Sequence, residues 1–125
     1  MRVLLVDDDA DQLAIRAMLL EQCGYETVAA TTSEAALEAA AREGLSCVVM
    51  DLRLPTTQEG IETLRRLREL QPPARIFVLT GMRQQSPELE QAQQYADGVL
   101  TKGAGMDNLL NILAELRDRA GLLQT

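Results

Sequence analysis

Short apolar runs end in polar residues at four places along the chain. In chain order these residues are the acids at positions 7–9, then Asp51, Thr80 and Lys102. Brief apolar runs separated by helical patterns are typical of buried parallel strands. Because ligands of an open parallel sheet lie outside the carboxyl ends of its strands, we expect these side chains to share one edge. Three or four carboxylates, a hydroxyl and one lysine gathered there predict a site for a divalent metal ion and a phosphate.

The elements that must position these residues alternate between strand and helix patterns along the whole chain. The expected strands are residues 2–6, 26–30, 47–51, 75–80 and 98–102. The expected helices are residues 10–23, 33–42, 61–70, 87–95 and 107–120. Five strand–helix units in succession require a parallel sheet with helices on both faces, and right-handed crossovers favour the order 2-1-3-4-5. We therefore predict an α/β fold, a flavodoxin-like doubly wound five-stranded parallel sheet with five helices.

Several local signals set the expected ends of these helices. Ser33 is expected to cap the second helix, and Ser86 is expected to cap the fourth with Pro87 in its first turn. Residues 54–60 are expected to form a loop. Asp9 and Asp11 are interpreted as acids in the first turn of the first helix.

The composition restricts the classes of function. The 125 residues carry a net charge of -7 and include no histidine. This length fits a single domain over residues 1–125, either a stand-alone protein or a fragment cut at a domain boundary. An acidic chain of this kind is not expected to bind nucleic acid directly, which needs clustered lysine and arginine. The lack of histidine excludes an imidazole base and a self-contained phosphohistidine step, but a carboxylate nucleophile needs neither.

Cysteine content and hydropathy give an expected location. Two cysteines are too few for a disulfide framework, and Cys47 is expected to be a small core residue rather than a reactive thiol. A reducing, cytoplasmic setting follows from that usage. No signal-peptide pattern follows Met1, and no apolar run approaches the ~20 residues needed to cross a bilayer. No membrane partner is expected.

The residues at the strand ends resemble the receiver domain of two-component response regulators. The resemblance covers essentially the whole chain, and all its motifs occur in order at the ends of four of the five expected strands. The matching residues are Val6-Asp7-Asp8, Asp51-Leu52-Arg53-Leu54-Pro55, Val78-Leu79-Thr80-Gly81 and Thr101-Lys102.

The resemblance implies a role for each of these site residues. Asp51 would be the phosphoacceptor. Asp7 and Asp8 would hold Mg²⁺ together with Asp51 and the backbone carbonyl of Arg53. Thr80 would bond a phosphoryl oxygen, and Lys102 would pair with Asp51 and then with the phosphoryl group. Elementary chemistry agrees, since Mg²⁺ takes oxygen ligands and a lysine offsets repulsion among clustered carboxylates.

The implied function is a phosphorylation-dependent signalling switch. Asp51 would receive its phosphoryl group from a histidine kinase or a phosphotransfer protein, and the changed conformation would alter partner binding or dimerisation. The domain is not expected to be an enzyme, although self-catalysed phosphoryl transfer and autodephosphorylation are. The output partner stays open, and one candidate is a homodimer through the fourth helix, last strand and last helix. Leu110, Leu122 and Leu123 would either contribute to that face or serve ordinary helix packing.

The chain departs from the usual receiver pattern in several places. Val99 follows Gly98 where an aromatic switch residue is usual, and Gly103 follows Lys102 where a cis-proline is usual. The loop before Gly60 is about one residue longer than usual. Two positions, Arg53 and Met82, tune phosphoryl lifetime in the family. Here the Arg53 side chain would fold over the site, pair with an acid such as Glu59, or remain solvated.

Two other functions are compatible with parts of the sequence. The first is a binding module that keeps the fold without using phosphorylation, which Val99 and Gly103 favour and the complete acidic set disfavours. The second is a phosphatase of the haloacid-dehalogenase type, in which Asp7 of the Asp7-x-Asp9 motif would be the nucleophile. The chain is short for the cap of such enzymes and lacks an obvious later acidic pair. Taken alone, the acids at 7–9 would also be an ordinary helix N-terminal cap.

Overall fold

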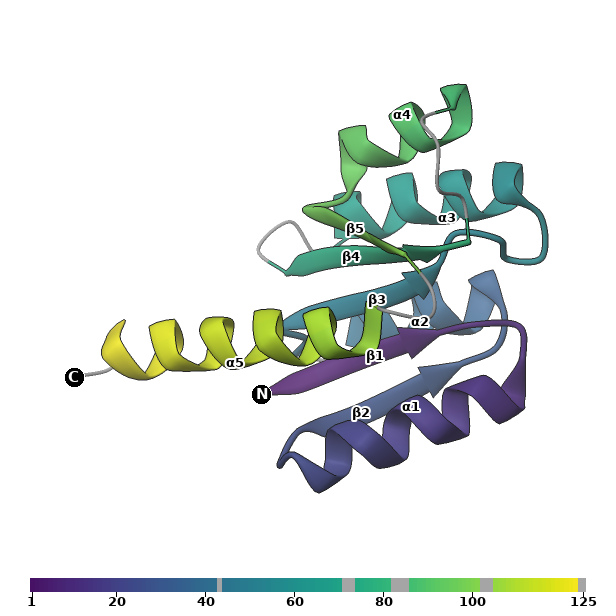
Figure 1. Cartoon of the computed structure of the whole chain (residues 1–125). Helices are drawn as coiled ribbons and strands as arrows, with labels where there is room; N and C mark the ends of the chain where they lie inside the picture. The colour runs from purple at the N-terminus through teal and green to yellow at the C-terminus, as the bar shows by residue number, and fades with distance from the viewer. Residues whose placement is uncertain (43, 71–73, 82–85, 102–104, 124–125) are drawn as a thin grey trace.

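Five parallel strands form one sheet with helices on both of its faces (Figure 1). The computed structural model describes residues 1–42, 44–70, 74–81, 86–101 and 105–123, apart from the side chains of residues 42, 105–107 and 119–123. The strand order is β2-β1-β3-β4-β5, as predicted. The strands are β1 Arg2–Val6, β2 Glu26–Ala30, β3 Cys47–Asp51, β4 Arg75–Thr80 and β5 Gly98–Thr101. The first four have their predicted bounds, and Lys102, predicted to end the fifth, lies outside the described residues.

The five helices follow the strands in strict alternation. They are α1 Ala10–Gln22, α2 Ser33–Arg42, α3 Thr57–Leu70, α4 Pro87–Tyr95 and α5 Gly105–Leu123. The prediction of residues 54–60 as a loop was wrong, because α3 begins one turn earlier than expected. Thr56 caps this helix: its hydroxyl accepts a hydrogen bond from the Glu59 N–H (3.2 Å), and its carbonyl accepts one from the Gly60 N–H (2.9 Å).

The N-cap residues of α1 and α2 differ from those expected from the sequence. Thr32, not Ser33, caps α2, because the Thr32 hydroxyl accepts the Ala35 N–H at 3.1 Å. Asp9 is the N-cap of α1 rather than a residue of its first turn, and its carboxylate accepts the N–H groups of Asp11 and Gln12. The predicted Ser86 cap of α4 is confirmed.

Alternating strand residues divide the core into two layers. Leu4 and Val6 of β1 pack with α2, α3 and α4 on one face. Val3 and Leu5 pack with α1 and α5 on the other face, where Leu109 and Leu113 are fully buried. Both faces of the sheet are therefore covered, which explains why the strands are continuous apolar runs.

A glycine allows α3 to approach the chain that follows β3. A Cβ atom on Gly60 would lie 1.7 Å from the carbonyl oxygen of Leu52. Leu52 directly follows Asp51, and its side chain and that of Leu54 are buried. The close approach of α3 thus fixes the segment that leaves the end of β3.

An arginine on α3 fixes the opposite, amino-terminal edge of β4 and β5. The Arg68 guanidinium donates to the Asp97 carboxylate (2.7 Å), to the Tyr95 carbonyl (2.8 Å) and to the Ala74 carbonyl (3.2 Å). The Ile76 N–H also donates to the Asp97 carboxylate, at 2.7 Å. Partial burial alone would raise the pKa of Asp97, but these hydrogen bonds and the nearby arginines outweigh it and lower that pKa.

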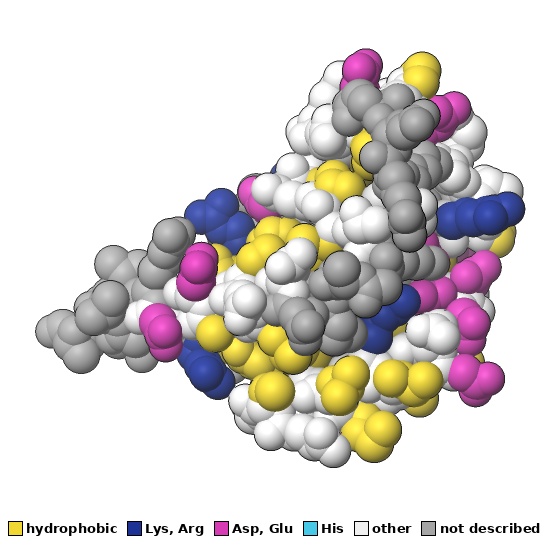
Figure 2. Space-filling model, viewed as in Figure 1, with side chains coloured by type: hydrophobic (Ala, Val, Ile, Leu, Met, Phe, Trp, Pro, Cys, Tyr) yellow, Lys and Arg dark blue, Asp and Glu magenta, His cyan; other side chains and the backbone are white. Residues whose placement is uncertain are grey.

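The surface carries two notable groups of side chains. Acidic side chains gather at the edge toward which the strands point (Figures 1 and 2), where Asp8, Asp9 and Asp11 are exposed. Hydrophobic side chains lie over α1, where Ile15 and Met18 are about half exposed (Figure 2). Within the described part of the chain, no helix is both long and apolar enough to cross a membrane.

Candidate phosphoacceptor site

Three of the predicted carboxylates meet at the carboxyl ends of β1 and β3. Val6 pairs with Met50 in the sheet, so the residues that follow each of them lie side by side. One carboxylate oxygen from each of Asp7, Asp8 and Asp51 lies within 4.8 Å of the other two. Asp7 and Asp51 are buried, with 1% and 5% of their surfaces exposed, whereas Asp8 is exposed.

Local backbone groups orient two of these carboxylates. The Asp9 N–H donates to Asp7 Oδ1 at 2.9 Å, and the Arg53 N–H donates to Asp51 Oδ1 at 3.1 Å. Desolvation, a hydrogen bond with Asp7 and the negative charges of Asp7 and Asp51 raise the pKa of Asp8. The cluster therefore favours a cation or a proton at Asp8.

Arg16 of α1 makes an ion pair with Asp7 that the sequence analysis did not predict. Its Nη1 atom lies 2.6 Å from Asp7 Oδ2, and both side chains are at least 90% buried. The signal was present in the sequence, because Arg16 shares the buried face of α1 with Leu13 and Leu20. A charged residue on a core-facing stripe requires a buried partner of opposite charge.

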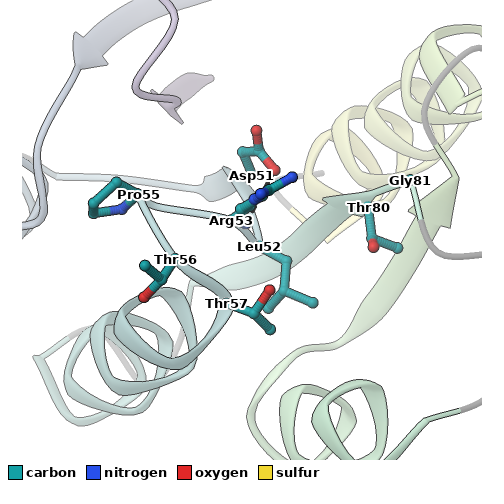
Figure 3. A pocket seen from close by; sticks show the side chains of 8 residues that line it. All are labelled: Asp51, Leu52, Arg53, Pro55, Thr56, Thr57, Thr80 and Gly81. Carbon is teal, nitrogen blue, oxygen red and sulfur yellow. Dashed lines mark hydrogen bonds between the residues drawn. The ribbon is translucent and has the colours of Figure 1, made fainter.

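Thr80 ends the strand next to Asp51. Asp51 pairs with Leu79, so Thr80 lies one residue further toward the carboxyl edge, and its side chain is buried. A hollow of about 650 Å³ lies between the two strand ends (Figure 3). Its lining consists of Asp51, Leu52, Arg53, Pro55, Thr56, Thr57, Thr80 and Gly81.

A second hollow, of about 390 Å³, shares Asp51, Arg53 and Pro55 with the first. Its lining consists of Asp7, Asp8, Asp9, Gln12, Asp51, Arg53 and Pro55. Asp51 is thus shared between a hollow lined by carboxylates and a hollow lined by hydroxyl groups. A group attached to the Asp51 side chain would therefore have both carboxylates and hydroxyl groups in its neighbourhood.

The remaining predicted site residues are only partly visible. Lys102, Gly103 and Met82 lie outside the described residues. Arg53 is exposed, and the described side chains show no ion pair between it and Glu59. Val99 is half-buried and packs against the core layer of α2, α3 and α4.

The residues present fit a divalent metal ion. Three carboxylates in mutual reach are the oxygen donors that Mg²⁺ and Ca²⁺ prefer, and the exposed Asp8 leaves an open side for water ligands. The Arg16 pair engages one oxygen of Asp7 and offsets part of its charge.

A flavodoxin-like sheet with an acidic cluster at its carboxyl edge is the architecture expected of a phosphoacceptor signalling domain. The family model of the response regulator receiver domain matches residues 3–114, and the chain belongs to that family. The domain is accordingly a phosphorylation-dependent signalling switch rather than a classical enzyme. The phosphatase alternative, with Asp7 as nucleophile, is therefore wrong.

Individual known proteins agree with this assignment. The chain is similar to the transcriptional regulatory protein KdpE of Mycobacterium tuberculosis, at 35% identity over 86% of this chain and 47% of that protein. It is also similar to a CheY-like receiver domain from Methanospirillum hungatei JF-1, with 28% identity, 96% of both chains covered and a TM-score of 0.84. A response regulator from Burkholderia pseudomallei, solved with a phosphorylated aspartic acid, calcium ion and citrate, shares 30% identity over 99% of this chain and 75% of that one, with a TM-score of 0.80. The chain spans 13% of the length of LuxN of Vibrio campbellii and 60% of the length of RegA of Rhodobacter capsulatus, two curated relatives that it matches.

Proposed function

We propose that Asp51 is the residue that accepts the phosphoryl group, from a phosphohistidine of a histidine kinase or a phosphotransfer protein. An Asp51 carboxylate oxygen attacks phosphorus, an O–P bond forms, and the N–P bond breaks with its electron pair leaving on the donor imidazole. Water later attacks the same phosphorus, which releases inorganic phosphate and restores the carboxylate. The observation that carries this assignment is that, among the described residues, Asp51 is the one carboxylate that lines both hollows.

Neighbouring groups of this chain have distinct parts in that reaction. The Arg53 N–H donates to one oxygen of Asp51 and so helps to orient the carboxylate for attack. The Thr80 hydroxyl donates to a phosphoryl oxygen from the neighbouring strand. Lys102 follows Thr101, the sheet partner of Thr80, and we assign it the pairing with Asp51 and then with the phosphoryl group.

We infer that the resident metal is Mg²⁺, held by Asp7, Asp8, Asp51 and the backbone carbonyl of Arg53. When bound, a divalent cation neutralises charge on the transferring phosphoryl oxygens. The direction of the Asp8 pKa supports the assignment, since desolvation and the neighbouring charges of Asp7 and Asp51 raise it and a bound cation would offset both effects.

The wider role is also part of the proposal. The described chain acts as a single receiver domain in the cytoplasm, and its phosphorylation changes an interaction made by α4, β5 and α5. A second copy of the chain is one candidate partner for that face. Leu110, which is half-buried and packs against the core, contributes to holding α5 on the sheet rather than to a free apolar surface.

The test is chemical labelling followed by intact mass. The protein is incubated with acetyl phosphate and Mg²⁺, beside a sample in which EDTA removes the metal. The variants are Asp51→Asn and, as a matched control, Asp11→Asn, which removes an exposed acid near the same edge. We expect a phosphoryl-sized gain in the wild-type protein and in Asp11→Asn, lost in Asp51→Asn and without Mg²⁺, and removed by hydroxylamine.

Other outcomes point to different conclusions. A gain that survives in Asp51→Asn would refute the assignment of the phosphoacceptor. No gain in the wild-type protein, at Mg²⁺ concentrations that shift the NMR signals of Asp7 and Asp8, would favour the binding module that does not use phosphorylation.

A further inference from the structure

The Arg16–Asp7 pair puts a protein cation inside the acidic cluster. Arg16 Nη1 lies 2.6 Å from an oxygen of Asp7, and Asp7 lies within the same 4.8 Å group as Asp8 and Asp51. The pair is nearly closed to solvent, with 10% of the Arg16 side chain and 2% of the Asp7 side chain exposed. Water therefore screens its charge weakly.

Both oxygens of Asp7 already have partners within this local structure. Oδ2 accepts from Arg16, and Oδ1 accepts from the Asp9 N–H. A cation that binds Asp7 must share an oxygen with one of these donors or displace it. Arg16 is the donor that carries a charge of the same sign as the incoming ion.

We propose that Arg16 competes with the divalent cation for Asp7 and thereby lowers the affinity of the site for the metal. In the metal-free domain the guanidinium replaces part of the missing cation charge, which makes a buried Asp7 tolerable. When the metal binds, the Arg16–Asp7 pair loosens. This inference rests on the proposed metal site and adds the residue that sets its strength.

Charge and hydrogen bonding are separated by three substitutions of Arg16. Arg16→Gln keeps an N–H donor but removes the charge, Arg16→Met removes both, and Arg16→Lys keeps the charge. Arg65→Gln is the matched control, because it breaks a 2.6 Å ion pair with Glu62 on the exposed surface of α3. The Kd for Mg²⁺ is measured by titrating MgCl₂ at constant ionic strength and following the amide NMR signals of the acidic cluster.

We expect the Kd for Mg²⁺ to fall on the order of tenfold in Arg16→Gln and Arg16→Met, because a like charge beside the ion has been removed. Arg16→Lys and Arg65→Gln should stay close to the wild-type value. The thermal midpoint supplies a second readout: Mg²⁺ should raise it more in Arg16→Gln than in the wild-type protein, since tighter binding to the native state stabilises it more.

Other results overturn the proposal in different ways. An unchanged or raised Kd in both Arg16→Gln and Arg16→Met would show that Arg16 only orients Asp7. No Mg²⁺ binding by the wild-type protein or any variant would refute the metal site itself. If the neutral variants do not fold, the competition can still be tested on the wild-type protein. Its Arg16 guanidinium N–H signals must lose protection from solvent exchange as Mg²⁺ saturates the site, and unchanged protection would refute the competition.

Discussion

Replacing Gly60 by alanine should destabilise the domain, although the same change usually stabilises a helix. Glycine inside a helix costs roughly 0.5–1 kcal/mol relative to alanine, so helix propensity alone predicts a gain. At Gly60 the added Cβ would lie 1.7 Å from the Leu52 carbonyl oxygen and 2.8 Å from its carbonyl carbon. Both are backbone atoms, which no side-chain rotation can move away.

The segment that would have to move is held from several directions. The Leu52 N–H donates to the Leu79 carbonyl of β4 at 2.9 Å, and the Leu54 N–H donates to the Thr56 carbonyl at 3.1 Å. The side chains of Leu52 and Leu54 are 1% and 0% exposed. Overpacking against a segment that cannot move usually costs about 1–3 kcal/mol and occasionally more, so we expect the free energy of unfolding to fall by about 3 kcal/mol.

The measurement is urea denaturation followed by circular dichroism. A loss of about 3 kcal/mol is a large part of the 5–15 kcal/mol typical of a domain, and the midpoint should fall without a change in the m-value. Gly44→Ala is the matched control, since nothing lies within 4 Å of its added Cβ. If Gly60→Ala proves as stable as Gly44→Ala, the close approach of α3 to Leu52 is refuted.

Two further predictions test the core and the edge of the sheet opposite the acidic site. Asp97→Asn should cost about 1.5–3 kcal/mol at pH 7, because it weakens a charge-assisted pair with Arg68, whereas Asp118→Asn on exposed α5 should cost less than about 0.5 kcal/mol. The pKa of Asp97 is lower in the folded protein than in the unfolded chain, so its stabilising effect is present above pH ~4 and is lost as the pH falls through the folded value. The stability difference between Asp97→Asn and the wild-type protein, measured by urea denaturation, should therefore vanish in acid. A difference that does not change with pH would contradict this. Burial and, to a lesser extent, the charge of Asp97 raise the pKa of the Cys47 thiol to about 12, so iodoacetamide should label exposed Cys23 in the native protein and Cys47 only after unfolding. Equal labelling rates in native protein, measured by mass, would refute that assignment.

Elements whose positions follow from chain order could be predicted from the sequence. Asp7 and Asp51 each end an apolar run, and the parallel sheet then had to bring them to one edge. The Thr56 cap was also readable, because Thr56 and Glu59 form the Thr-x-x-Glu pattern of a helix start. Such signals are local, so the sequence alone contains them.

Contacts that depend on packing between elements could not be predicted in the same way. The periodicity of α1 shows that Arg16 faces the core, but which acid it meets depends on how α1 lies against β1. Likewise, the need for glycine at position 60 arises from the approach of α3 to Leu52, and no pattern within α3 contains that information.

The hydrogen bonds made by Arg68 have a mechanical consequence for the switch. They tie the carboxyl end of α4, through the Tyr95 carbonyl, and the amino end of β5, through Asp97, to the rigid helix α3. The Ala74 carbonyl, just before β4, also accepts from Arg68, and the Ile76 N–H at the start of β4 donates to the same Asp97 carboxylate. A movement of α4 that begins at Thr80 would either leave the carboxyl end of this helix in place or break its hydrogen bond with Arg68, so we expect the amino end of α4 to move more than its carboxyl end.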